Sequence, residues 1–152
     1  MNLPKIYHTA NPNLLINGSV SAIPQWIKVT KTYTDFAIAG LTNDIEIYSL
    51  PAKGVIHSVI IKHSILFTGG TISAYTVSTG ITGTLAKYST AFDIKQAVSD
   101  TVIKMGIPAA VPSLENYGSV KSIRGAAIST TGNLDEATQG SVDFYLLVSK
   151  LP

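Results

Sequence analysis

Two of the three histidines in this chain lie close together in one hydrophobic stretch, where they could act as metal ligands or as a general base. His57 and His63 both fall within residues 54–66, GVIHSVIIKHSIL. Side chains of a strand alternate between its two faces, so the even spacing predicts that both rings project from the same face. Six residues of extended chain span about 20 Å, which is too far for two ligands of one metal ion. No partner for a catalytic base can be identified either, so we interpret both histidines as strand residues.

The carboxylates offer no better candidate for an active site. Asp93 and Asp100 flank one loop, and Asp135 is adjacent to Glu136 in another. Two carboxylates can catalyse glycoside hydrolysis when they face each other across a cleft. Their spacing in the sequence does not predict that arrangement, and adjacent acidic residues more simply cap a turn or face solvent. We therefore expect no catalytic residue, no metal and no cofactor. The hypothesis that the protein is a small hydrolase depends on these unassigned carboxylates alone.

Aromatic side chains are the feature that best suits a binding module. Their rings can stack on sugars or anchor a protein contact. Most of the tyrosines lie within strand patterns, where core packing or subunit contact is the commoner role. Trp26 is the one tryptophan and follows a proline-containing N-terminal segment directly. We take Trp26 as a candidate contact residue, and the surroundings of Trp26 or Tyr117 as the candidate carbohydrate site.

The composition is unusually poor in charge. Charged residues are 13% of the 152 residues, against about 25% in ordinary soluble domains. One interpretation is that other subunits cover much of the surface, because charged residues are depleted at the centres of interfaces. The alternative is a Ser/Thr-faced β protein that is simply weakly charged. We favour the covered surface.

Length and charge distribution restrict the classes of partner. The chain is long enough for one domain with a core of its own. The ten lysines are scattered and Arg124 is the one arginine, so no cluster suits phosphate contacts and we expect no direct nucleic-acid binding. No apolar stretch approaches the roughly 18 residues that span a bilayer. The first residues lack the pattern of a signal peptide, so we expect synthesis in a cytoplasm and no membrane contact.

Short β-like segments recur along the chain, separated by Gly, Pro, Asn and Ser, and β-branched and aromatic residues dominate them. The expected strands are residues 25–30, 32–40, 44–50, 54–66, 70–81, 100–105, 119–130 and 141–151. Residues 91–98 and 134–138 each suggest a helical turn that is too short to form a layer. Parallel strands need long crossovers, which are missing. The pattern therefore predicts an all-β protein, an antiparallel β-sandwich with the eight strands of a jelly roll.

Two segments do not fit this sandwich. Residues 1–24 contain three prolines and one short apolar run, so we expect an extended N-terminal arm, with the sandwich domain at 25–152. A disordered tail or a first edge strand is the alternative for the arm. Residues 106–118, GIPAAVPSLENYG, predict a long apolar loop that suits a contact. The candidate contact residues are Pro4, Ile6, Tyr7, Leu14, Leu15, Ile16, Trp26, Pro108, Val111 and Pro112.

Three stretches together resemble a known class of proteins. They are LTNDIEIYSLPAKGVIHSVIIKHSILFTGGTISAYTVSTGI at 41–81, KYSTAFDIKQAVSD at 87–100 and GNLDEATQGSVDFYLLVSKLP at 132–152. Their combination resembles small virion proteins of tailed bacteriophages with a β-sandwich fold, which serve as capsid decoration (cement) proteins or as modules attached to heads or tails. The resemblance covers roughly residues 41–152 and includes no catalytic motif.

The resemblance implies a non-enzymatic structural role. Decoration proteins of this kind typically form trimers, bind the outer capsid surface between capsomers and stabilise the expanded shell, often with N-terminal arms. It therefore implies a homotrimer with the major capsid protein as partner and the virion as location. The candidate contact residues would then meet a sister subunit or the capsid. The alternative is a carbohydrate- or receptor-binding module of a phage head or tail fibre.

Overall fold

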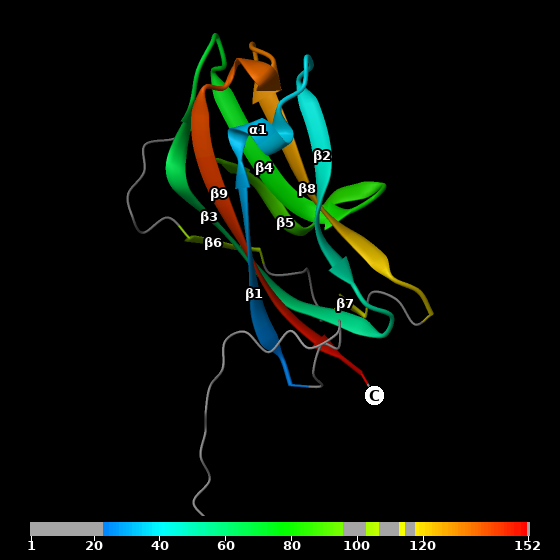
Figure 1. The fold of residues 1–152 in the computed structure, drawn as a ribbon. Helices are drawn as coiled ribbons and strands as arrows, with labels where there is room; N and C mark the ends of the chain where they lie inside the picture. The colour runs from blue at the N-terminus through cyan, green and yellow to red at the C-terminus, as the bar shows by residue number, and fades with distance from the viewer. Residues whose placement is uncertain (1–22, 96–102, 107–112, 115–117, 152) are drawn as a thin grey trace, which may run out of the picture.

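The computed structural model describes residues 23–95, 103–106, 113–114 and 118–151, and it describes side chains for 23–95 and 118–151. These residues form nine β-strands and two helical turns (Figure 1). The strands are β1 (Gln25–Thr32), β2 (Thr42–Leu50), β3 (Gly54–Thr68), β4 (Ala74–Ile81), β5 (Thr84–Asp93), β6 (Ile103–Gly106), β7 (Ser113–Leu114), β8 (Lys121–Thr130) and β9 (Gln139–Lys150). The helical turns are α1 (Tyr33–Phe36) and the 3₁₀ helix η1 (Leu134–Glu136).

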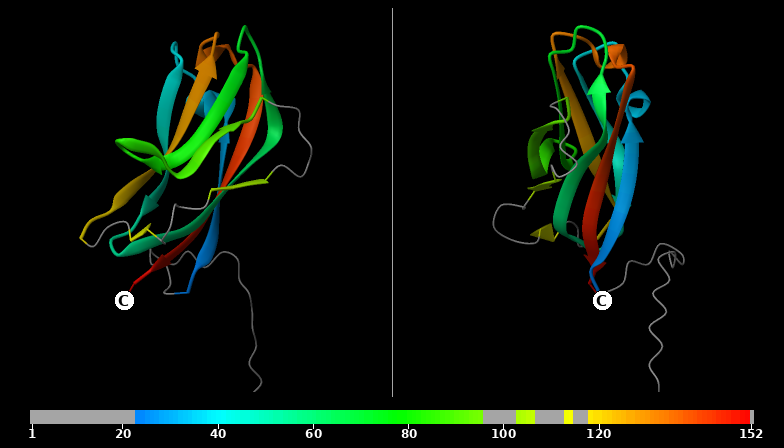
Figure 2. Two further views of the ribbon diagram at one scale, coloured as in Figure 1. Left: turned by 180° about the vertical axis from the view of Figure 1, so that it is seen from behind. Right: turned by 90° about the vertical axis from the view of Figure 1, so that its left-hand side faces the viewer.

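The strands form two antiparallel sheets that pack face to face. One sheet has the order β1-β9-β3-β6, with β7 also pairing with β3, and the other has the order β2-β8-β4-β5. The two layers are seen in the side view of Figure 2. The predicted all-β antiparallel sandwich is therefore confirmed.

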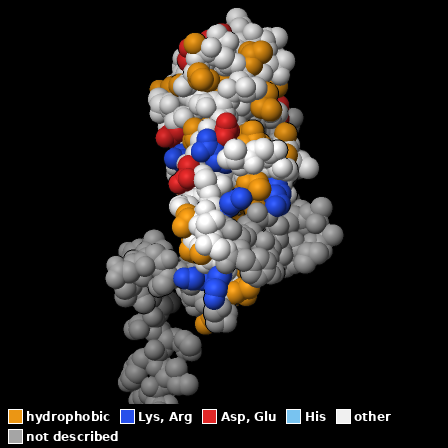
Figure 3. Space-filling view, turned by 90° about the vertical axis from the view of Figure 1, so that its right-hand side faces the viewer, with side chains coloured by type: hydrophobic (Ala, Val, Ile, Leu, Met, Phe, Trp, Pro, Cys, Tyr) orange, Lys and Arg blue, Asp and Glu red, His pale blue; other side chains and the backbone are white. Residues whose placement is uncertain are grey.

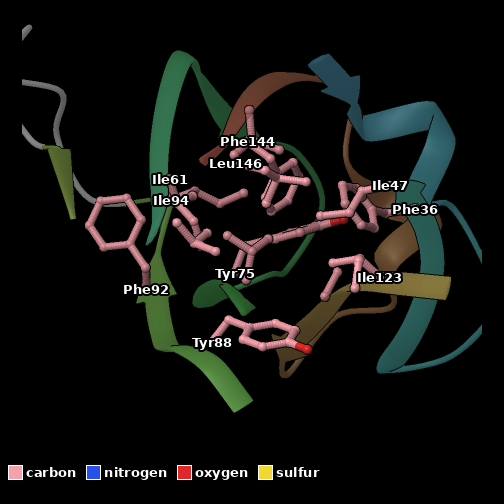
Figure 4. Close-up of a cluster of buried hydrophobic side chains, with 14 of the residues drawn as sticks. Phe36, Ile47, Ile61, Tyr75, Tyr88, Phe92, Ile94, Ile123, Phe144 and Leu146 are labelled. Atoms are coloured by element: carbon pink, nitrogen blue, oxygen red, sulfur yellow. The ribbon is translucent and has the colours of Figure 1, made fainter. Parts of the chain in front are cut away.

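Alternating side chains of both sheets build the core. In β9 the side chains of Val142, Phe144, Leu146 and Val148 are fully buried, while the residues between them project from the other face. This is the period-2 pattern expected of a strand with one face on a core. The opposite sheet contributes Tyr75 and other residues, and Tyr75 extends across the centre of the cluster in Figure 4.

Three predicted elements are wrong in type. Residues 32–40 do not form one strand, because the chain turns into α1 after Thr32. The Asp35 carboxylate accepts hydrogen bonds from the Thr32 backbone N–H at 2.7 Å and from the Thr32 hydroxyl at 2.9 Å, which closes the turn. Residues 91–93 end strand β5 instead of starting a helical turn. Within the predicted loop 106–118, Ser113–Leu114 pairs with β3 as β7.

Strand β5 was missed because its alternation is irregular. Its pairing with β4 shifts register twice, between Val77 and Thr79 and between Thr79 and Ile81. Each shift changes which residues face the core, so a period-2 search finds no strand there. The helical turn predicted near residues 134–138 is present as η1. Neither helical element in the described part of the chain is long enough to span a membrane.

Candidate functional site

His57 and His63 both lie in β3, as predicted, but the prediction that they share a face is wrong. A β-bulge between Ile56 and Ser58 makes His57 an extra residue opposite β9 and reverses the alternation of the strand. The His57 ring lies on the outer face, where Nε2 is 2.7 Å from the Ser149 hydroxyl oxygen. His63 points inward and is buried.

Of the acidic side chains considered for catalysis, Glu136 and Asp93 hold the loops that carry them, and Asp100 lies outside the described residues. Glu136 accepts hydrogen bonds from the backbone N–H groups of Thr71, at 2.9 Å, and of Asn133, at 3.0 Å. These bonds lower the pKa of the Glu136 carboxyl and tie the β3–β4 and β8–β9 connections together. Asp93 accepts hydrogen bonds from the backbone N–H groups of Tyr75 and Lys95. Among the residues that the structure describes, no group of three or more histidines and carboxylates is placed to hold a metal ion.

One hollow inside the sandwich has no room for a water molecule, so it cannot hold a ligand. Its lining consists of Phe67, Thr68, Ile72, Tyr75, Lys95 and Ala137.

Trp26 is the candidate contact residue that the structure places clearly. It is the second residue of β1, which among the described strands pairs with β9 alone, and its side chain is 50% exposed. Its neighbours Ile27 and Val29 pack against the core, so Trp26 and Lys28 project outward. Opposite Trp26 on β9 lies Leu147, which also faces outward.

The same outer face carries a small polar cluster further along β1. The Asp143 carboxylate accepts a hydrogen bond from the Thr30 hydroxyl at 2.6 Å and forms an ion pair with the Lys28 ammonium at 3.0 Å. The bond and charge of Asp143 raise the pKa of Lys28. The Lys28 ammonium also lies 5.7 Å from the centroid of the Tyr145 ring. This cluster satisfies its own charges, so it stabilises the face instead of offering free groups to a substrate.

Several strand ends meet at one end of the sandwich, which we call the basal end. Leu50 at the end of β2 pairs with Lys121 at the start of β8, and Gly54 at the start of β3 pairs with Lys150 at the end of β9. The start of β1 lies there too (Figure 1). Exposed residues of the basal end are Ile23, Trp26, Val120 and Leu151, and Lys121 and Lys150 are partly exposed there.

Most of the predicted contact residues lie outside the described residues. They are Pro4, Ile6, Tyr7, Leu14, Leu15, Ile16, Pro108, Val111 and Pro112. Sequence reasoning did not single out Val120, Leu151, Lys121 or Lys150. Their signal was weak, because each is an ordinary residue at a strand end and only the pairing of distant strands brings them to the same end.

Comparison with solved structures relates the fold of this chain to known ones. A chain of the cyanophage Pam1 capsid asymmetric unit matches with a TM-score of 0.60 at 18% identity, over 85% of each chain. The fold is one found in a bacteriophage capsid. A chain from the capsid of Ralstonia phage GP4 matches at 15% identity over 87% of each chain, with a TM-score of 0.49. A chain from the acid-stable capsid of Helicobacter pylori bacteriophage KHP30 matches at 15% identity over 86% of this chain and 99% of that one, with a TM-score of 0.39.

At these identities the likeness concerns the fold. No protein-family model matches this sequence, and no curated protein matches it either.

Proposed function

We propose that this protein is a non-enzymatic structural component of a bacteriophage virion. The observation that carries the proposal is the shared fold with a chain of the cyanophage Pam1 capsid, which extends over 85% of both chains. A fold alone does not determine a function. The side-chain geometry agrees with a structural role, because His57, Glu136 and Asp143 are engaged in hydrogen bonds that hold strands and loops together.

The order of the strands supports the proposal. Along the chain, β1, β2, β3 and β4 alternate between the two sheets, and β8 and β9 again lie in different sheets. Since β6 and β7 both pair with β3, they can be counted as one interrupted edge strand. The sandwich then has eight strand positions in the interleaved order of a jelly roll, an architecture common in viral capsid proteins. We propose this topology for the chain.

Within the virion, we propose a capsid decoration protein that binds the outer surface of the shell between capsomers. A protein that binds only the assembled, expanded lattice stabilises that lattice by mass action. The low charge content and the exposed Trp26 suit a protein with several covered surfaces. We further propose that it acts as a homotrimer and that residues 1–24 form an arm that contacts a sister subunit or the major capsid protein.

The composition of purified particles tests this proposal. We would purify virions of the phage, or of the induced prophage, whose genome encodes this sequence, separate heads from tails, and quantify the chain by mass spectrometry. A decoration protein should be found in the head fraction in a fixed ratio to the major capsid protein. Recovery only with tails would instead support a tail module, and absence from both fractions would rule out a virion role.

A carbohydrate- or receptor-binding module is the second candidate. The half-exposed ring of Trp26 beside outward-facing Leu147 favours it, because such a ring can stack on a sugar. A glycan array with the purified protein distinguishes the two. Binding that is lost in Trp26→Ala would support the module, while a blank array together with the protein in the head fraction would support decoration.

A further inference from the structure

The two ends of the sandwich differ in charge. At the basal end, Lys121 and Lys150 are partly exposed and form no ion pair with any described residue. None of the described Asp or Glu residues lies at the strand ends that make up this end of the sandwich. On the face drawn in Figure 3, Lys or Arg side chains lie near hydrophobic ones at the lower end and also around the middle, where the acidic side chains are close to them.

The opposite end, which we call the apical end, consists of α1 and the β3–β4 and β8–β9 connections. It carries Asp35, Asp135 and Glu136. Two of these carboxylates hold the loops of the apical end. Asp35 accepts a hydrogen bond from the Thr32 backbone N–H, and Glu136 accepts one from the Thr71 backbone N–H. Of the described ion pairs, Lys31 with Asp35 lies at the apical end, and Arg124 with Asp44 and Lys28 with Asp143 lie along the body of the sandwich. Lys121 and Lys150 therefore give the basal end a positive charge that no described ion pair neutralises.

Large apolar side chains are exposed at the basal end too. Trp26 is 50% exposed, Val120 is 63% exposed and Leu151 is 39% exposed. Tryptophan is enriched among the interface residues that contribute most of the binding energy. A lysine at the rim of an interface mainly affects the association rate and the choice of partner. Apolar groups with a basic rim are the composition expected of a protein docking surface.

We propose that the basal end is the surface through which this protein docks, and that its partner is a protein surface with acidic side chains around an apolar patch. This inference rests on the proposed virion role and specifies the chemistry of the shell surface that the protein would meet. A nucleic acid is the less suitable partner, because the basal end has no arginine and offers few cations for phosphates.

The experiment is an add-back assay with two matched variants. Shells are prepared from a phage that lacks the gene, and purified protein is added at 50 mM and at 500 mM NaCl before sedimentation. The test variant is Lys121→Glu/Lys150→Glu. The control is Lys87→Glu/Lys95→Glu, which lowers the net charge equally but changes residues of β5 and of the segment after it. Circular dichroism and thermal melting check folding, and Lys121→Gln/Lys150→Gln replaces the test variant if the double reversal does not fold.

We expect wild-type binding to weaken with salt, the test variant to bind about tenfold more weakly or worse, and the control to bind within about twofold of wild type. If wild type binds and the basal variant binds equally well, the basal inference is overturned and the virion role stands. Competition of binding by added duplex DNA would also overturn it, in favour of a nucleic-acid contact. If wild type does not bind shells at all, the proposed decoration role fails, and the inference that depends on it fails too.

Discussion

The imidazole ring of His63 stacks on the phenyl ring of Phe92, with ring centroids 5.5 Å apart and ring planes inclined by 20°. His63 belongs to β3 and Phe92 to β5, so the stack connects the two sheets. Neither ring nitrogen of His63 has a hydrogen-bond partner among the described residues. Burial lowers the pKa of His63, and the nearby Asp93 carboxylate opposes this effect in part. The folded protein therefore keeps His63 neutral between the sheets.

This stack predicts a loss of stability at mildly acidic pH. Because the pKa of His63 is lower in the folded state than its ordinary 6.5, the unfolded chain takes up the proton first. Stability is thus complete above about pH 6.5 and falls as the pH drops toward the folded-state pKa, by at most about 1.4 kcal/mol per pH unit. His63→Phe should remove this slope. Chemical denaturation of both proteins between pH 7.5 and 5 measures it, and equal slopes would contradict the prediction.

The denaturation experiment should stop at pH 5, because two carboxylates affect the stability of the protein at lower pH. The pKa values of Asp35 and Glu136 are lowered by hydrogen bonds from backbone N–H groups. Their contribution to stability is present above the ordinary carboxyl pKa and is lost as the pH falls below about 4. A loss of stability above pH 5 therefore reports on His63 and not on these groups.

Removing the buried hydroxyl of Tyr75 should stabilise the protein. Tyr75 is fully buried, its hydroxyl has no hydrogen-bond partner among the described residues, and burial raises its pKa. A buried hydroxyl without a partner costs about 1–3 kcal/mol, so Tyr75→Phe should gain about 1 kcal/mol of unfolding free energy. The control Tyr75→Leu leaves a cavity and should lose about 2–4 kcal/mol. A destabilised Tyr75→Phe variant would mean that the hydroxyl is satisfied.

Gly140 should not tolerate a side chain. It begins the inward-facing part of β9 with φ +148°, a conformation that L-residues rarely adopt, and an added Cβ would overlap the ring of Phe67. Gly140→Ala should therefore lose about 2–4 kcal/mol from backbone strain and overpacking. Gly40→Ala is the matched control, because its Cβ would meet nothing within 4 Å. Thermal melts of the two variants should differ clearly, and equal melting temperatures would show that Phe67 can move aside.

Trp26→Ala should affect binding much more than folding. The ring is 50% exposed, so its removal should cost less than about 1 kcal/mol of stability. If Trp26 anchors the protein on a shell, the affinity for shells should fall about tenfold or more. Ile65→Ala is the control, since Ile65 is 52% exposed but lies away from the basal end. Similar affinities for the two variants would exclude Trp26 as an anchor.

Deleting residues 1–24 tests the proposed arm. We expect the full-length chain to scatter light as a trimer and the shortened chain to dissociate or to lose attachment to shells, because apolar arm residues such as Leu14 and Ile16 would no longer be buried. The sandwich core should stay folded, since the described core residues all lie after residue 24. If the protein is a monomer with and without residues 1–24, and the deletion does not change its binding to shells, both the proposed trimer and the proposed arm are wrong.

The sequence by itself was enough to predict that the layers of this protein are β-sheets and which face of a regular strand points to the core. Alternation in residues 139–150 specifies which side chains of β9 face the core, and the lack of long amphipathic segments excludes helical layers. The turn at η1 was also predictable, because Leu134, Asp135 and Glu136 follow the capping residue Asn133. These features depend on neighbours along the chain.

Only the tertiary structure decided which strands are neighbours and where the alternation breaks. The bulge that separates the faces of His57 and His63 is defined by the register of β3 against β9, more than 80 residues later in the chain. Lys121 and Trp26 lie toward the same end of the sandwich because β8 and β1 each pair with a distant strand. A periodic pattern specifies a face, but pairing between distant strands is set by the packing of the whole sandwich, so the sequence alone could not locate this surface.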